Sequence, residues 1–358
     1  MSTPLLFQPI SFRSVTAKNR IVVAPMCQYS SVDGMGDDWH VQHLGARAAG
    51  GAGIVMAEAT AVADIGRITP GCLGAYTPEH RDALARIAAI IVKCGSVPAI
   101  QIAHAGRKAS CNVPWDGGKP IPSNAGGWVT VAPSAIPMIA GGEDPHALSV
   151  DEIAGVVAQF AATARMAREA GFKVLEIHSA HGYLSHSFLS PISNHRNDQY
   201  GGDLSGRSRF LMEIIDAVRA EWPDDLPLWV RISCSDYMAG GLTIDDTVEL
   251  SRRLAQRGDV DLIDCSSGGV SNDQKIPSLH PGYQVPFAEA IRSRAGIATG
   301  AVGMITEATH AAEILANGRA DVVLLARALL AEPAWPLRAA KTLGVKPDLL
   351  SQYLRAAL

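Results

Sequence analysis

Residues 151–183 read DEIAGVVAQFAATARMAREAGFKVLEIHSAHGY, and this stretch decides the fold. Residues 151–170 repeat apolar side chains at helical spacing, and Gly171 follows as a stop signal. Residues 174–178 form a short aliphatic run without polar alternation, which is typical of a parallel strand buried on both faces. The stretch therefore predicts one helix–strand unit of a parallel α/β protein.

The same alternation continues along the chain. Strand-like runs occupy residues 21–25, 53–59, 97–103, 174–178, 228–233, 260–266, 296–301 and 321–326, and helical patterns occupy 78–94, 151–170, 207–222, 244–257 and 306–317. Eight strands that alternate with helical stretches predict a (β/α)₈ TIM barrel, formed by residues 1–358 as a single domain. An open doubly wound sheet is the alternative, because a strand count does not prove closure.

Composition excludes several classes of protein. The 358 residues are 47% hydrophobic and 18% charged, with a net charge of −4, so the chain is not disordered. It has no run of Lys and Arg, which argues against nucleic acid and anionic membranes as partners. Six scattered cysteines without a CxxC pair indicate neither a zinc site nor a disulfide framework. Without a signal core or a membrane-spanning segment, we expect a soluble cytoplasmic protein.

Two connections are too long for simple barrel loops. Residues 106–148 follow the third strand and residues 179–205 follow the fourth, so both belong to the C-terminal face, where barrel enzymes carry their active sites. Long loops in compact domains are usually functional. We therefore expect residues 106–148 to form a lid.

Arg231 lies inside an apolar strand pattern, where an isolated cation costs several kcal/mol. Two interpretations remain open from the strand alone. The arginine forms a structural salt bridge with a carboxylate such as Glu58 or Glu176, or it is kept for an anion that appears during the reaction.

Residues 300–303 (Gly-Ala-Val-Gly) and Arg327 follow the seventh and eighth strands. Glycine-rich turns expose backbone N–H groups, and arginine adds a bidentate charge, so the pair predicts a phosphate site at the usual place in a barrel. The alternative is a tight turn into the next helix.

His178 and His181 follow the fourth strand three residues apart. The spacing fits half of a metal site, a donor pair for a carbonyl oxygen, or surface histidines. A metal site needs a third ligand, which His104, Glu176 or Asp264 could supply.

At these residues the sequence resembles the Old Yellow Enzyme family of flavin-dependent ene-reductases, and specifically the thermophilic-like subgroup that includes the xenobiotic reductases. The similarity runs from about residue 7 to residue 341. The matching segments are residues 24–30 (APMCQYS), 57–62 (AEATAV), 101–108 (QIAHAGRK), 176–202, 230–233 (VRIS), 300–303 (GAVG) and 326–327.

The resemblance implies a TIM barrel that binds FMN noncovalently. It places Arg231 at the flavin N1 and C2 carbonyl edge, where negative charge accumulates on reduction. The residues that it assigns to the flavin ring and the phosphate are Ala24, Pro25, Met26, Cys27, Ala59, Gln101, Ala301, Gly303, Ala326 and Arg327.

The resemblance also implies an NADPH dehydrogenase-type enzyme that takes electrons from NADPH or NADH. In a ping-pong reaction it would reduce activated alkenes such as enones, maleimides and nitroalkenes. His178 and His181 would bind the substrate oxygen, Tyr183 would protonate the α carbon, and Tyr29 would be a further donor. Cys27 marks the subgroup, as a weak donor near flavin N5.

The C-terminal tail, residues 345–358, resembles a subgroup tail whose arginine enters the partner's active site. Arg355 would take that role in a homodimer or higher homo-oligomer. Two other functions compete with the ene-reductase. One is a metal-dependent hydrolase or isomerase with His178 and His181 as ligands, and the other is a flavoprotein that stores or senses redox state.

Overall fold

The computed structural model describes residues 3–356, and its centre is a closed barrel of parallel strands in the order β10-β11-β12-β3-β4-β5-β8-β9. Parallel pairing of β12 with β3 closes the barrel. The predicted TIM barrel is confirmed, and the open doubly wound sheet is wrong. The strands are β3 (Ile21–Val23), β4 (Ile54–Ala61), β5 (Val97–Ala103), β8 (Val174–Ser179), β9 (Leu228–Ser233), β10 (Leu262–Ser266), β11 (Ala298–Ala301) and β12 (Val322–Leu325).

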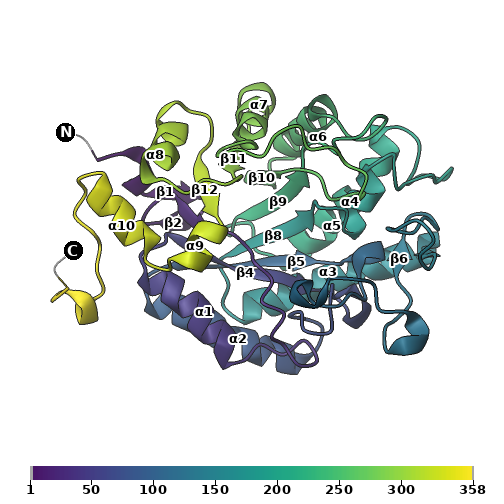
Figure 1. Cartoon of the computed structure of the whole chain (residues 1–358), viewed down its shortest axis with the longest axis horizontal. Helices are drawn as coiled ribbons and strands as arrows, with labels where there is room; N and C mark the ends of the chain where they lie inside the picture. Colours follow the sequence, from purple (N-terminus) through teal and green to yellow (C-terminus); the bar gives the residue numbers. More distant parts are fainter. Residues whose placement is uncertain (1–2, 357–358) are drawn as a thin grey trace.

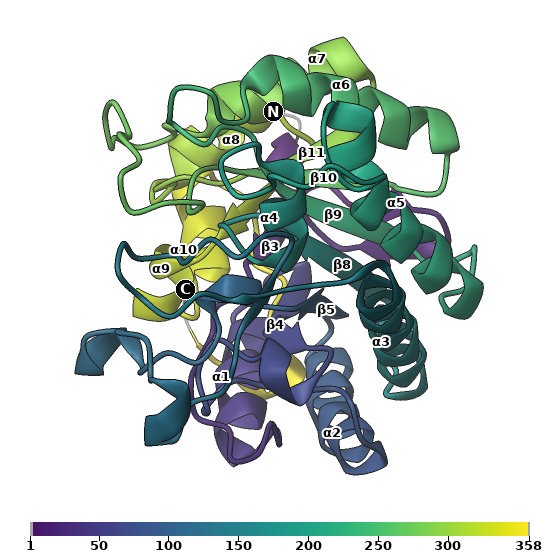
Figure 2. The same ribbon diagram turned by 90° about the vertical axis from the view of Figure 1, so that its right-hand side faces the viewer.

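Helices surround the strands as a ring, which Figure 2 shows from the end of the barrel. They are α1 (Asp38–Ala49), α2 (Pro78–Lys93), α3 (Val150–Glu169), α4 (Leu184–Leu189), α5 (Leu204–Glu221), α6 (Ile244–Arg257), α7 (Val285–Ala295), α8 (Ala308–Ala316), α9 (Arg327–Ala331) and α10 (Trp335–Thr342). The helical patterns predicted α2, α3, α5, α6 and α8 to within three residues at each end. No helical pattern is assigned to the other helices, because histidines interrupt the apolar stripe of α1, α7 follows a polar loop, and α4, α9 and α10 are short.

The two ends of the barrel differ. A hairpin of β1 (Ile10–Phe12) and β2 (Val15–Ala17) covers the N-terminal end, where Phe12 meets Trp229 edge to face at 5.3 Å. Residues 106–148 extend from the opposite end in Figure 1. They form short 3₁₀ turns and a two-stranded ladder of β6 (Val131–Ala132) with β7 (His146–Ala147).

Every second residue of a strand faces the same side of the sheet, so the side chains inside the barrel form successive layers, here called levels. Ala99, Val174, Trp229 and Leu262 pack together in one apolar cluster inside the barrel. Two residues further along the same strands come Gln101, Glu176, Arg231 and Asp264, all buried. A polar level therefore lies above an apolar floor, on the side where the strands end.

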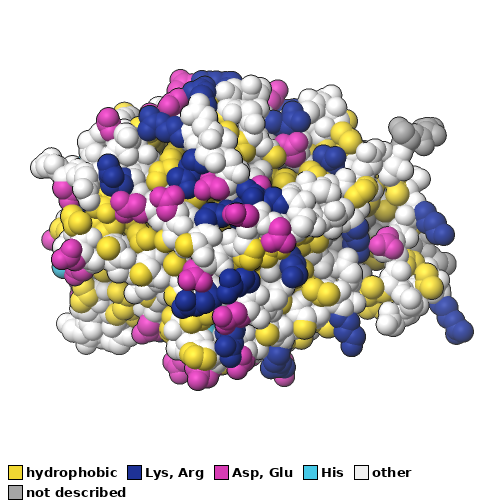
Figure 3. Space-filling model, turned by 180° about the vertical axis from the view of Figure 1, so that it is seen from behind, with side chains coloured by type: hydrophobic (Ala, Val, Ile, Leu, Met, Phe, Trp, Pro, Cys, Tyr) yellow, Lys and Arg dark blue, Asp and Glu magenta, His cyan; other side chains and the backbone are white. Residues whose placement is uncertain are grey.

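Charges of both signs cover the outside. In Figure 3, Lys and Arg side chains are interspersed with Asp and Glu over the face shown. Within residues 3–356, no helix is long and apolar enough to cross a membrane.

We predict that Phe12→Ala destabilises the protein by about 3 kcal/mol, the usual scale for removing a buried aromatic ring. The ring packs against Trp229 and closes the apolar floor of the barrel. Urea unfolding followed by circular dichroism measures the loss. The control is Thr16→Ala on the exposed side of the same hairpin, which should change stability by less than about 0.5 kcal/mol. An equal loss of stability in the two variants would contradict the role of Phe12 in closing the apolar end of the barrel.

Candidate active site

A cavity of about 300 Å³ opens where β11 and β12 end. Five of the residues assigned to the cofactor line it, namely Ala24, Arg231, Gly303, Ala326 and Arg327. Ala301 is buried at the end of β11, directly before the cavity residue Val302. The predicted phosphate turn and the strand arginine therefore face one space.

The lining suits a flat, phosphate-bearing cofactor such as FMN. Gly303 has a φ of +109°, and a Cβ there would lie 3.0 Å from the backbone nitrogen of Gln284, so a side chain would be strained and crowded. The cavity residues Ala24 and Ala326 have small side chains, which leave its volume free. The exposed Arg327 forms no ion pair with any carboxylate of the described residues, which leaves its guanidinium available to an anion.

The partner of Arg231 is Asp264. Arg231 Nε lies 2.9 Å from Asp264 Oδ2, because the parallel register of β9 and β10 puts the two residues side by side. The structure thus shows the salt bridge that was one of the two interpretations of Arg231, but the suggested partners Glu58 and Glu176 are wrong. Glu58 instead accepts a hydrogen bond from the backbone N–H of Gln28 at 2.8 Å.

Gln101 is fixed from the neighbouring strand. Its Nε2 donates to Glu176 Oε1 at 2.7 Å, across the paired β5 and β8. The amide nitrogen is thereby engaged, and the amide oxygen is left to accept from a ligand.

The hydrogen bonds of His178 and His181 define their tautomers. The backbone N–H of Ala180 donates to His178 Nδ1 at 3.1 Å, so the proton of the neutral ring is on Nε2. His178 Nε2 then donates to His181 Nδ1 at 3.3 Å, and His181 Nε2 donates to Ser266 Oγ at 2.6 Å. One relay of N–H donors runs from β8 to the end of β10.

Both imidazoles are neutral at pH 7. Desolvation lowers the pKa of His178 and of His181 well below 6.5, and the positive charge of Arg231 lowers both further. The pair therefore offers N–H donors without a positive charge.

Tyr183 completes this cluster. Its ring lies edge to face with His178 at 4.9 Å and with His181 at 6.4 Å. Desolvation raises the pKa of its phenol well above 10, so the hydroxyl keeps its proton at neutral pH. Tyr183 shares a small hollow with Ala59 at the end of β4.

The turn that carries these side chains is held by several bonds. His181 has a φ of +59°, a left-handed conformation that is strained for a residue with a side chain. Ser233 Oγ accepts from the backbone N–H of His181 at 2.9 Å, and Lys108 Nζ donates to its carbonyl oxygen at 2.7 Å. The neighbouring N–H of Gly182 donates to His186 Nδ1 at 2.7 Å.

His186 is itself fixed by a buried carboxylate. Because its Nδ1 accepts from Gly182, the proton is on Nε2, which faces Asp236 Oδ1 at 3.0 Å. Asp236 also accepts from Ser190 and from the backbone N–H of Leu242. This dyad anchors the turn from outside the site.

The other assigned residues lie around the same opening. Pro25, Met26, Cys27 and Tyr29 follow β3 and are half-buried, and Tyr29 borders an outer hollow of about 180 Å³ together with Lys108. Tyr29 is also left-handed, with a φ of +53°. A hydrogen bond with Cys72 raises the pKa of Cys27, and desolvation adds to the effect.

Arg355 is not part of this constellation. It is exposed beside the last 3₁₀ turn (Ser351–Tyr353), and Figure 1 shows this segment at the end of the barrel opposite residues 106–148. Within its own chain, Arg355 lines neither the cavity nor the outer hollow.

Sequence reasoning missed Ser266 and the supports of the turn. Ser266 ends a predicted strand, so a complete survey of polar residues at strand ends would have found it. Lys108 belongs to a segment that carried the resemblance, but nothing in its spacing showed which carbonyls it binds. Among residues 3–356, no three His, Cys, Asp or Glu side chains gather as metal ligands, so His178 and His181 have no third ligand there.

Comparison with known proteins agrees with this geometry. A model of the NADH:flavin oxidoreductase / NADH oxidase family matches residues 5–345. An NADPH dehydrogenase from Geobacillus sp. (strain WCH70) is 49% identical over 356 residues, 98% of each chain. An NADPH dehydrogenase from Bacillus subtilis (strain 168) is 45% identical over 352 residues, again 98% of each chain.

Solved structures agree as well. Morphinone reductase in complex with tetrahydroNAD superposes with a TM-score of 0.77 at 25% identity, over 97% of this chain and 93% of that one. The Old Yellow Enzyme homologue from Zymomonas mobilis gives 0.77 at 26% identity, over 98% and 96%. The chain belongs to the NADH:flavin oxidoreductase / NADH oxidase family, the Old Yellow Enzyme family, and is an FMN-dependent NADPH oxidoreductase.

Proposed function

We propose that this oxidoreductase reduces activated C=C bonds, in α,β-unsaturated carbonyls, maleimides and nitro compounds. The observation that carries the proposal is the cluster of His178, His181 and Tyr183, in which two neutral N–H donors adjoin a protonated phenol. When bound, FMN supplies the redox chemistry, taking two electrons from NADPH or NADH and passing them to the acceptor.

In this proposal the histidines bind the carbonyl or nitro oxygen of the substrate. Their N–H groups polarise the conjugated double bond and stabilise the negative charge that develops on the oxygen. Each neutral imidazole has one N–H, so substrate binding would redirect these donors from His181 Nδ1 and Ser266 Oγ to the substrate oxygen. Tyr183 then donates its phenolic proton to the α carbon, and Tyr29 is a further donor to the substrate.

The cofactor would lie between the strand ends and this cluster. Ala24, Pro25, Met26, Cys27 and Ala59 would line its ring, and Gln101 and Arg231 would face its polar edge. The phosphate would bind at Ala301, Gly303, Ala326 and Arg327, which the cavity at the ends of β11 and β12 supports. Within this proposal residues 106–148 act as the lid, because Pro114, Met138 and Ile139 line the outer hollow beside Tyr29.

A stepwise spectrum tests the function. Visible flavin absorption should bleach when NADPH is added without oxygen and return when 2-cyclohexenone follows. Absorption that bleaches but returns only with oxygen would contradict enone reduction and indicate a redox-storing flavoprotein.

Tyr183→Phe should slow reoxidation by 2-cyclohexenone about 10²–10⁴-fold, the usual contribution of a general acid, and should leave bleaching by NADPH unchanged. The phenol is lost while the ring that contacts His178 is kept. Stopped-flow absorbance separates the two half-reactions. Tyr76→Phe, outside the cluster, should behave like wild type. Reoxidation of Tyr183→Phe at the wild-type rate would remove Tyr183 as the acid.

His178→Ala should weaken binding of a phenol about tenfold or more, because a phenolate oxygen that mimics the substrate oxygen loses a charged hydrogen bond. Titration of the flavin spectrum with p-hydroxybenzaldehyde measures the affinity. The matched control is His195→Ala, a histidine exposed on the loop after α4. If the two variants bind the phenol equally well, His178 is not part of the oxygen site.

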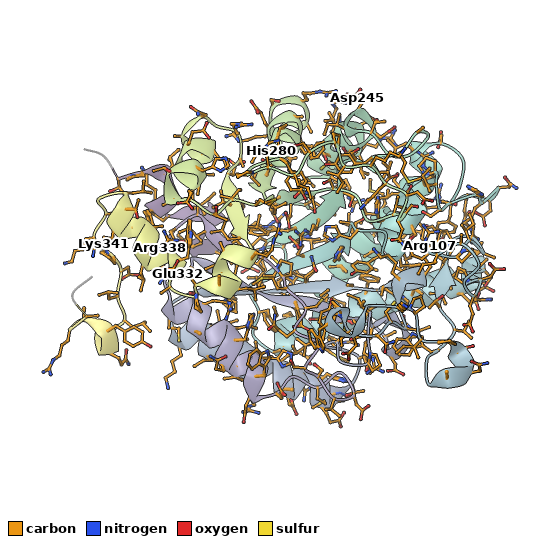
Figure 4. All side chains as sticks on the ribbon, in the orientation of Figure 1. Arg107, Asp245, His280, Glu332, Arg338 and Lys341 are labelled. Carbon is orange, nitrogen blue, oxygen red and sulfur yellow. The ribbon has the colours of Figure 1, made fainter. Side chains whose placement is uncertain are left out.

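We also propose a homodimer in which Arg355 enters the partner's active site. The exposed tail supports this, since Arg355 cannot reach the cavity of its own chain. Arg355→Ala should raise the KM for 2-cyclohexenone about fivefold or more without loss of FMN, the scale of one lost charged contact. The control is Arg338→Ala on α10, which removes a surface ion pair with Glu332 (Figure 4). An unchanged KM, or a monomer in sedimentation, would contradict the proposal.

A further inference from the structure

The polar level of the barrel holds two buried carboxylates and one cation. Glu176 on β8 and Asp264 on β10 are both 0% exposed, and Arg231 on β9 lies between their strands. Gln101 on β5 is the remaining polar neighbour. The charged groups that act on Glu176 are Asp264 and Arg231. Neither carboxylate belongs to the residues that bind substrate in the proposed function.

Glu176 and Asp264 differ in the groups that they contact. Asp264 Oδ2 lies 2.9 Å from Arg231 Nε, an ion pair. Glu176 Oε1 accepts only from the neutral amide of Gln101, at 2.7 Å. Glu176 Oε2 and both oxygens of Asp264 have no hydrogen-bond partner in the described residues, so the ion pair with Arg231 is what separates the two carboxylates. One cation compensates one anion. A second ionised carboxylate here would be a buried charge without a partner, which costs more free energy than a neutral carboxylic acid.

The titration tendencies point the same way. Desolvation raises the pKa of Glu176 well above 4.5, and the charge of Asp264 raises it further. Desolvation raises the pKa of Asp264 only to about 6, because Arg231 opposes it. Together with the ion pair of Asp264 and Arg231, these directions assign the negative charge to Asp264 and the proton to Glu176.

We propose that this asymmetric pair sets the reduction potential of the flavin, with ionised Asp264 offsetting the charge of Arg231 and protonated Glu176 positioning the amide of Gln101. The inference rests on the proposed place of Arg231 and Gln101 at the polar edge of FMN. Negative charge accumulates on the cofactor when it is reduced, so a fully uncompensated Arg231 would favour the reduced form. Asp264 and Glu176 act through their neighbours and are positioning residues.

Two nearly isosteric variants distinguish the carboxylates. Asp264→Asn removes the negative charge beside Arg231, and should shift the equilibrium between oxidised and reduced FMN at least about tenfold toward the reduced form, about 30 mV for two electrons. Glu176→Gln keeps an acceptor for Gln101 Nε2 and removes no charge. It should leave the same equilibrium at pH 7 within about threefold of wild type.

The measurement is the midpoint potential of each holoenzyme, read from the flavin spectrum against a reference dye during slow anaerobic reduction. A shift in Asp264→Asn alone supports the proposal. Equal shifts in both variants would show that Glu176 is also ionised and would overturn it. Unchanged potentials in both would overturn the electrostatic link to the flavin.

An infrared spectrum keeps the test sharp if Asp264→Asn fails to fold. A protonated Glu176 gives a carboxylic-acid C=O band in wild type that disappears in Glu176→Gln, and absence of that band would overturn the charge assignment. Neither measurement uses an alkene. Failure of this inference therefore leaves the test of enone reduction untouched, and failure of enone reduction leaves the potentials and the band to be judged separately.

Discussion

The alternation of side chains along the parallel strands is the constraint on which the rest of the site depends. Trp229 faces the barrel interior, so Arg231 must face it too, and Ser233 follows at the mouth. The same sequence of levels runs along β10 through Leu262, Asp264 and Ser266. A shift of one residue in either strand would turn the guanidinium or the carboxylate toward the helices and break the ion pair of Arg231 with Asp264.

Support for the turn that carries His181 comes from outside the cluster of His178, His181 and Tyr183. A left-handed His181 is costly, and it persists because its own N–H and carbonyl are both bound, by Ser233 and Lys108. The buried His186–Asp236 dyad fixes the next peptide. Lys108 also places its cation 5.2 Å from the ring centre of Tyr183. The turn is thus held by β9, by the loop after β5 and by α4, so the backbone that presents His181 and Tyr183 is preorganised.

Local sequence patterns were sufficient to predict the fold. The site was predicted less completely, because its contacts join residues of different strands. Short aliphatic runs showed each barrel strand, because burial on both faces leaves a plain signal in the sequence. The partner of Arg231 needed the register of β9 on β10, which no single segment contains, so Asp264 was considered only as a metal ligand. The roles of Lys108 and His186 were hidden for the same reason, since each binds backbone atoms brought near only by folding.

Positive charges near the histidines explain why both imidazoles are neutral. Arg231 and Lys108 are both close to the histidines, and both disfavour an added proton on His178 and His181. The imidazoles therefore remain neutral donors, and the fixed positive charge is carried by Arg231 at the cavity and by Lys108 beside the ring of Tyr183. Desolvation raises the pKa of Tyr183 and keeps the proton of its phenol in place. In the proposed reaction, a phenol that resists ionisation in the resting site would release its proton only to a carbon that has gained electron density, which would link protonation to the arrival of electrons from the cofactor.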